Sequence, residues 1–153
     1  MTTLNEKLTL VANLAVVVGV FFLVAELRQN TRAIEAQTRD SMTEKQMLFA
    51  EWIATNPATA DVYIRAGADP DAVSPTERAM YSLLVQGNWR EWENSLYQFE
   101  HGLFTEEEFL PRVNVWRALM QNPGYRSLWV DLGDRYSPSF RQHIDQILAD
   151  SAK

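Results

Sequence analysis

The N-terminal part of the chain is an apolar segment followed by a polar one, with no helix breaker between them. Leu8–Ala25 carries no charge, and its only clearly polar side chains are Thr9 and Asn13. The polar stretch Glu26–Asp40 follows without an intervening glycine or proline. At a rise of about 1.5 Å per residue, the apolar segment spans roughly 27 Å as a helix, close to the ~30 Å hydrocarbon thickness of a bilayer. The pattern predicts a transmembrane helix that continues into water as a stalk.

Two other interpretations fit an apolar run of this length. A buried core helix is the first, but the run is apolar on all sides, whereas helices at the surface of a core are apolar on one face. A cleaved signal peptide is the second. Glu6 beside Lys7 makes its charged region only weakly basic, and cleavage after Ala25 would put Leu23 where a small residue is required. These features favour an uncleaved membrane anchor.

The basic residues near the span predict its orientation. Lys7 precedes it, whereas Arg28, Arg32 and Arg39 follow it within a short distance. Basic residues concentrate on the cytoplasmic side of membrane helices. We therefore expect the N-terminus outside and the C-terminal part in the cytoplasm. The chain has no cysteine, which fits either compartment.

Small residues lie on one side of the predicted span. Steps of four and three along the helix connect Leu8, Ala12, Ala15, Gly19, Phe22 and Glu26. Ala15 and Gly19 form a small-xxx-small pair, which lets two helix backbones approach closely, and Asn13 offers an interhelical hydrogen bond. The alternative is that Ala and Gly are common in any span and that Asn13 lies near one edge of it. We predict association through Ala12, Asn13, Ala15 and Gly19.

The polar stalk carries weaker signals. Glu35 and Arg39 are four residues apart, a spacing that supports a solvated helix. A thin heptad stripe consists of Leu27, Ile34, Ser41 and Leu48. It leaves two possibilities open, a parallel bundle of stalks or a single helix leaning on its own domain. The residues predicted to contact a partner just beyond the span are Arg28, Asn30, Arg32 and Ile34.

Helix start and stop signals divide the remainder into about five helices. Proline and capping residues predict a stop at Asn56–Pro57 and helix starts at Ser74–Glu77, Thr105–Glu108, Asn122–Pro123 and Ser137–Pro138. A short helix is expected over Ala58–Ala66 with Gly67 as its stop; Gly102 and Gly133 are expected to end two others, and Pro111 to kink one. The sequence thus predicts an all-α chain divided into a transmembrane helix (1–27), a stalk helix (28–56) and a compact cytoplasmic helical domain (57–153).

The side chains that could support chemistry are few. There are two histidines, His101 and His143, and neither stands three residues after a glutamate as a di-iron helical bundle requires. We predict no catalytic residue, cofactor or metal. Glu93, Tyr97 and His101 share one helix face, which is either a polar groove or an ordinary surface strip.

Aromatic and charged residues alternate on the same predicted helix. Trp89 and Trp92 are interleaved with charged neighbours, among them Glu91, and could bind a stacked ligand. Tryptophans in a small domain are more often core and interface anchors.

The charge distribution narrows the class of partner. Residues 46–153 hold nine basic and fifteen acidic side chains, a net charge of −6. This charge repels nucleic acid and an anionic membrane surface. We expect partners to be apolar or basic protein surfaces.

Three stretches carry a resemblance to a known family. The segment Leu27–Ala33 matches a "qiRqNTrA"-like pattern after a span, Leu96–Glu107 is similar to an aromatic helix ending near "yyqyr-G-l-d-e-e", and Asn122–Phe140 to an "NPG…W…SPeF" tail. The chain therefore resembles, over nearly its whole length, a widespread family of uncharacterised bacterial proteins with one N-terminal membrane helix and a helical cytoplasmic domain. Pro111 is a departure, because the corresponding helix is usually uninterrupted. The resemblance implies topology and fold and transfers no catalytic residue.

These observations combine into one prediction with two alternatives. We predict a single-pass protein of the bacterial inner membrane that self-associates and acts, without catalysis, as a scaffold or accessory subunit of a larger membrane complex. The first alternative is a small homo-oligomeric pore lined by Asn13, Gly19 and Glu26. The second is a membrane-anchored ligand sensor or enzyme that uses the Glu93/Tyr97/His101 face.

Overall fold

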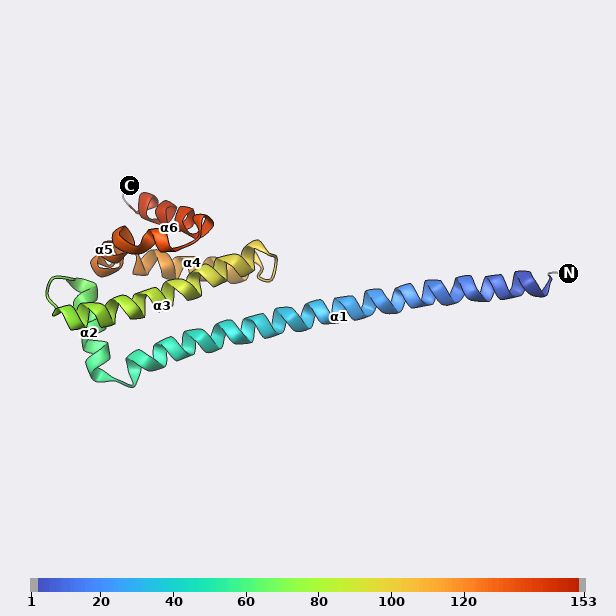
Figure 1. The fold of residues 1–153 in the computed structure, drawn as a ribbon, viewed down its shortest axis with the longest axis horizontal. Coiled ribbons are helices and arrows are strands. Elements are labelled where there is room, and N and C mark those ends of the chain that lie inside the picture. Colours follow the sequence, from blue (N-terminus) through green and yellow to red (C-terminus); the bar gives the residue numbers. More distant parts are fainter. Residues whose placement is uncertain (1–2, 152–153) are drawn as a thin grey trace. The chain divides into compact units, whose positions relative to one another are not determined.

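The structure is a computed structural model that describes residues 3–151, and these residues are helical apart from short connections (Figure 1). The elements in order are α1 (Leu4–Ala54), α2 (Pro57–Ala68), α3 (Pro75–Glu100), α4 (Glu106–Leu119), α5 (Pro123–Leu132), the short 3₁₀ helix η1 (Gly133–Arg135) and α6 (Pro138–Asp150). No strand occurs within the described residues. The all-α prediction, with a long N-terminal helix followed by a compact part of five further helices, is confirmed.

Helix α1 is 51 residues long and joins the apolar and polar segments without a break. The chain divides into two units, residues 1–39 and residues 40–153. In the first unit, the apolar stretch of α1 has no buried residue, and α1 is long and apolar enough to cross a membrane. The second unit begins within α1, so the last turns of this helix belong to the helical domain.

The predicted capping signals define the ends of α3 and α4. The Ser74 side chain accepts a hydrogen bond from the Glu77 backbone N–H, and the Glu77 carboxylate accepts one from the Ser74 N–H. Thr105 and Glu108 form the same reciprocal box at the start of α4. Helix α3 ends before Gly102, whose φ of 73° lies in the left-handed region that favours glycine. These boundaries were predicted correctly.

The stop predicted at Gly67 was wrong. Helix α2 continues through Gly67 to Ala68, and Asp69 caps it. Gly67 is glycine for a different reason: a Cβ at this position would lie 2.8 Å from the Nδ2 atom of Asn122. Close packing against the start of α5 therefore explains Gly67, which the sequence pattern had indicated as a helix stop. Pro111 lies inside α4, which continues through it.

The core of the second unit is built around stacked aromatic rings. Trp92 lies between Trp116 of α4, at a centroid distance of 5.3 Å, and Tyr125 of α5, at 5.9 Å, and both pairs are stacked. Trp89, one helical turn earlier on α3, contacts Tyr125 and Trp129 edge to face. These indoles are almost completely buried. Four of the five tryptophans thus fix α3 against α4 and α5.

Helices α2, α3 and α5 approach most closely at Gly124, which is buried at the start of α5. A Cβ there would lie 2.4 Å from the Ala66 carbonyl oxygen and 2.6 Å from the Tyr81 hydroxyl oxygen. Backbone cannot move aside as a flexible side chain can, so this position requires glycine. Gly87, on α3, is the opposite case, because a Cβ there would meet nothing within 4 Å.

We expect Gly124→Ala to destabilise the domain by about 1–3 kcal/mol or more, because the added methyl group overpacks a closed contact. Gly87→Ala is the matched control and should stabilise α3 by about 0.5–1 kcal/mol, since alanine is the better helix former. Urea unfolding of the full chain, followed by tryptophan fluorescence, measures both. Equal effects of the two substitutions would contradict the packing that the structure shows.

Glu77 couples the start of α3 to α2. Its carboxylate accepts the Ser74 backbone N–H at 2.8 Å and pairs with the Arg65 guanidinium at 2.5 Å. The Ser74 N–H, followed by Arg65, lowers the pKa of Glu77 from 4.5 to about 2. A lowered pKa means that the ionised carboxylate stabilises the folded state, so this contribution is complete above pH 4.5 and is lost as the pH falls toward 2.

We therefore expect Glu77→Gln to lower the melting temperature at pH 7 and to make progressively less difference as the pH is lowered from 4.5 toward 2. Thermal unfolding followed by circular dichroism at a series of pH values tests this. Glu107→Gln, in the first turn of α4, is the control and should show a smaller effect at pH 7. A Glu77→Gln effect that stayed constant with pH would rule out the ionised cap as its source.

Candidate functional site: a groove between α1, α3 and α4

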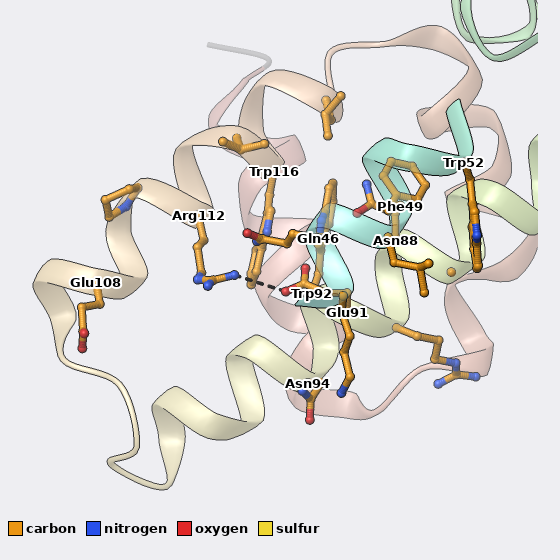
Figure 2. Close-up of a pocket in the computed structure, with 17 residues that line it drawn as sticks. Gln46, Phe49, Trp52, Asn88, Glu91, Trp92, Asn94, Glu108, Arg112 and Trp116 are labelled. Atoms are coloured by element: carbon orange, nitrogen blue, oxygen red, sulfur yellow. Dashed lines mark hydrogen bonds and ion pairs between the residues drawn. The ribbon is translucent and has the colours of Figure 1, made fainter. Parts of the chain in front are cut away.

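A concave groove of about 770 Å³ lies in the second unit. It lies between the last turns of α1, the middle of α3 and helix α4 (Figure 2). Its volume is in the range of small-molecule binding sites. The residues that line it are Lys45, Gln46, Leu48, Phe49, Trp52, Gly87, Asn88, Arg90, Glu91, Trp92, Asn94, Glu108, Pro111, Arg112, Val115, Trp116 and Leu119.

The walls of the groove are mostly apolar. Trp92 and Trp116, the stacked pair of the core, lie at its floor and are almost completely buried, while Trp52 on α1 is 52% exposed. Val115 on α4 is also more than half exposed. Trp52 is thus the one tryptophan that is not buried in the aromatic core. Exposed aromatic and aliphatic side chains around a concavity are typical of a binding surface.

An ion pair lies in the middle of this apolar surface. Arg112 Nη1 on α4 and Glu91 Oε1 on α3 are 3.2 Å apart, and their side chains are only 16% and 10% exposed. The buried Ser95 hydroxyl donates a second hydrogen bond, of 3.0 Å, to the same carboxylate oxygen. Arg112 also lies over the Phe104 ring, at 5.1 Å from its centroid. Figure 2 shows the pair joined across the groove, with Phe49 and Trp52 on the other side of it from Glu108.

Burial raises the pKa of Glu91 above its usual value. Ser95, Arg112, Lys45 and Gln46 act in the opposite direction and offset part of this effect. The ionised carboxylate is therefore held in an unfavourable environment by its neighbours. Such a pair stabilises a fold little in comparison with apolar side chains of similar size, and leaving one member alone is costly.

The face predicted from Glu93, Tyr97 and His101 lies elsewhere on α3. Glu93 accepts a 2.7 Å hydrogen bond from the Ser137 backbone N–H, at the start of α6, and pairs with Arg90. Tyr97 and His101 stack on each other with ring centroids 3.9 Å apart. Glu93 and Tyr97 line a second, smaller hollow of about 420 Å³, and His101 is not among its lining residues. Glu93 thus has a structural task, joining α3 to α6.

The residues predicted for helix association and partner contact lie in the first unit. Ala12, Asn13, Ala15 and Gly19 are all exposed, and nothing lies within 4 Å of a Cβ built at Gly19. The stalk residues Arg28, Asn30, Arg32 and Ile34 are exposed as well. Their roles remain predictions, because they depend on a second chain or a partner.

Within residues 3–151, no group of three or more His, Asp or Glu side chains is placed so that it could hold a metal ion. His143 is packed against the rings of Phe109 and Trp116. Burial lowers its pKa, so that the neutral imidazole is favoured. This histidine belongs to the aromatic core.

Sequence reasoning found only part of the groove. Glu91 and Trp92 were noted as possible ligand contacts, but Arg112 and Trp52 were not selected. Glu108, Arg112 and Trp116 are four residues apart, so the sequence could have shown that they share a face of α4. The pairing of Arg112 with Glu91 connects two different helices, so no local sequence pattern predicts it.

Comparison with known proteins adds no relative. No protein-family model, no curated protein and no solved structure matches this chain significantly. The resemblance to a bacterial family of membrane-anchored helical proteins therefore remains a prediction from the motifs quoted above.

The ion pair can be tested by a double-mutant cycle. We expect Arg112→Met alone to destabilise the domain by about 1–3 kcal/mol, because it leaves the Glu91 carboxylate buried without its partner. Adding Glu91→Met should recover much of that loss, since both charges are then gone. Urea unfolding gives the free energies. Simple additivity of the two substitutions would show that the side chains are not coupled.

Proposed function

We propose that this chain is a single-pass protein of the bacterial inner membrane that acts as a scaffold or accessory subunit of a larger complex. One observation carries the proposal: a continuous helix whose apolar stretch is fully exposed leads into the helical unit. An exposed apolar helix of this length is stable in hydrocarbon and unstable in water. The helical unit then presents an apolar groove and an exposed tryptophan, which suit binding better than catalysis.

The proposed orientation places the N-terminus outside and the helical unit in the cytoplasm. It is supported by Arg28, Arg32 and Arg39 after the apolar stretch, against Lys7 before it. The proposed self-association is supported by the exposed seam of Ala12, Ala15 and Gly19, which permits close helix packing.

Because the chain has no native cysteine, single cysteines can report the topology. We expect Asn5→Cys to react with a membrane-impermeant maleimide in intact bacterial cells. Val130→Cys, at a side chain that is 85% exposed on α5, should react only after the cells are permeabilised. The reverse pattern would overturn the orientation, and recovery of the protein in the soluble fraction would overturn the membrane anchor.

Self-association can be measured by native mass spectrometry of the detergent-extracted protein with co-purifying subunits retained. We expect an oligomer, or a fixed ratio to another membrane protein, and loss of any homo-oligomer in Gly19→Ile. Val18→Ile is the control, because it lies off the seam. A closed ring of four or more copies would favour the pore lined by Asn13, Gly19 and Glu26. A monomer without any bound subunit would contradict association through Ala12, Ala15 and Gly19.

A further inference from the structure

The groove contains hydrogen-bond donors that the protein itself does not use. Arg112 donates through Nη1 to Glu91, and no other hydrogen bond from its guanidinium occurs within residues 3–151. Lys45 is exposed in the last turns of α1 and acts on Glu91 through its charge, and its side chain makes no hydrogen bond to a described residue. Both side chains are donors only and cannot accept a hydrogen bond.

The Glu91 carboxylate, on which both cations act, is in the opposite situation. Glu91 Oε1 accepts hydrogen bonds from both Arg112 and Ser95, and Gln46 contributes a further favourable interaction. A cationic ligand would have to share this carboxylate with Arg112, the guanidinium that already pairs with it. An anionic ligand would instead meet donors without partners, which favours a negative charge on the ligand.

The charge around the groove agrees with this conclusion. Three basic and two acidic side chains line it, whereas residues 46–153 as a whole hold nine basic and fifteen acidic ones. The groove is thus a locally positive region on an acidic unit. Such a region attracts one anionic group more readily than the surrounding surface does.

The aromatic residues that line the groove indicate what the uncharged part of the ligand is. Phe49 is partly exposed and Trp52 is half exposed at the groove, while the buried Trp92 and Trp116 lie beneath them. Indole rings bind planar apolar groups by offset stacking or edge-to-face contact. A buried ion pair surrounded by such rings adds little to the stability of the fold, which is consistent with a role in recognition.

We propose that the groove binds a small molecule with an aromatic body and one carboxylate, which Arg112 and Lys45 contact while Phe49 and Trp52 hold the ring. The site is distinct from the Glu93/Tyr97/His101 face and lies entirely within residues 40–153. The proposal therefore does not depend on membrane insertion or self-association.

Three probes with the same ring and different charges test it: 2-naphthoate, 2-naphthamide and 2-naphthylmethylammonium. Each is titrated into the full chain in nanodiscs by isothermal calorimetry, with empty nanodiscs measuring partition into lipid. We expect naphthoate to bind about tenfold more tightly than the neutral amide, a difference of about 1.4 kcal/mol, and the cation to bind least. Equal affinity for the three probes, tighter binding of the cation, or no binding above the empty-nanodisc signal would overturn the proposal.

Two pairs of variants locate the site. Lys45→Gln, at an exposed side chain, should weaken naphthoate binding several-fold and leave naphthamide unchanged. Arg141→Gln on α6, outside the groove, is its control. Val115→Asp should abolish naphthoate binding by placing a carboxylate on the wall, whereas Val130→Asp, also at an exposed valine but on α5, should not. Loss of binding in both aspartate variants, or in neither, would place the site elsewhere.

Circular dichroism and the melting temperature of each variant separate loss of binding from loss of fold. Lys45→Gln keeps the test decisive if Arg112 substitutions unfold the unit, because the exposed Lys45 side chain forms no hydrogen bond within the described residues. Failure here would leave the maleimide labelling and mass measurements unaffected, so the two proposals are judged independently.

Discussion

The indole of Trp92 is stacked on Trp116 at one face and on Tyr125 at the other, and the arrangement of the helical unit depends on this contact. Aromatic pairs contribute about 0.5–1.5 kcal/mol beyond the burial of their area, and Trp92 joins three helices through two of them. Trp89 and Trp129 extend the aromatic cluster toward α6 through edge-to-face contacts. Because these rings are rigid and closely packed, they fix the separation of α3 and α4, and hence the floor of the groove.

The ion pair of Glu91 and Arg112 is buried beside this rigid core and adds little to the stability of the fold. Glu91 and Arg112 are nearly covered, yet apolar residues of similar size would stabilise the same position at least as well. The pair lines the groove between α1, α3 and α4, and the exposed Trp52 lines the same groove. Stability alone gives no reason for this combination, whereas the proposed recognition of a ligand with a charged and an aromatic part would give one.

Helix α1 combines an apolar segment and a polar segment in one continuous element. Its first part has apolar side chains on every side, and its last turns pack in the helical unit, where Met42 is buried and Phe49 contacts Tyr63. A backbone that satisfies its own hydrogen bonds can pass from hydrocarbon to water without interruption. The proposed membrane anchor and the proposed binding groove are therefore connected by a single helix, and the proposed scaffold function uses both.

The sequence by itself determined the local features: the length and polarity of α1, the all-α class, and the capping boxes at Ser74 and Thr105. These depend on residues a few positions apart, so one window of sequence contains the whole signal. Only the tertiary structure decided that Gly67 and Gly124 are packing contacts, that Glu93 accepts the Ser137 N–H at the start of α6, and that Arg112 meets Glu91. Each of these joins segments distant in the chain, and their pairing follows from how the aromatic core closes, which no local pattern encodes.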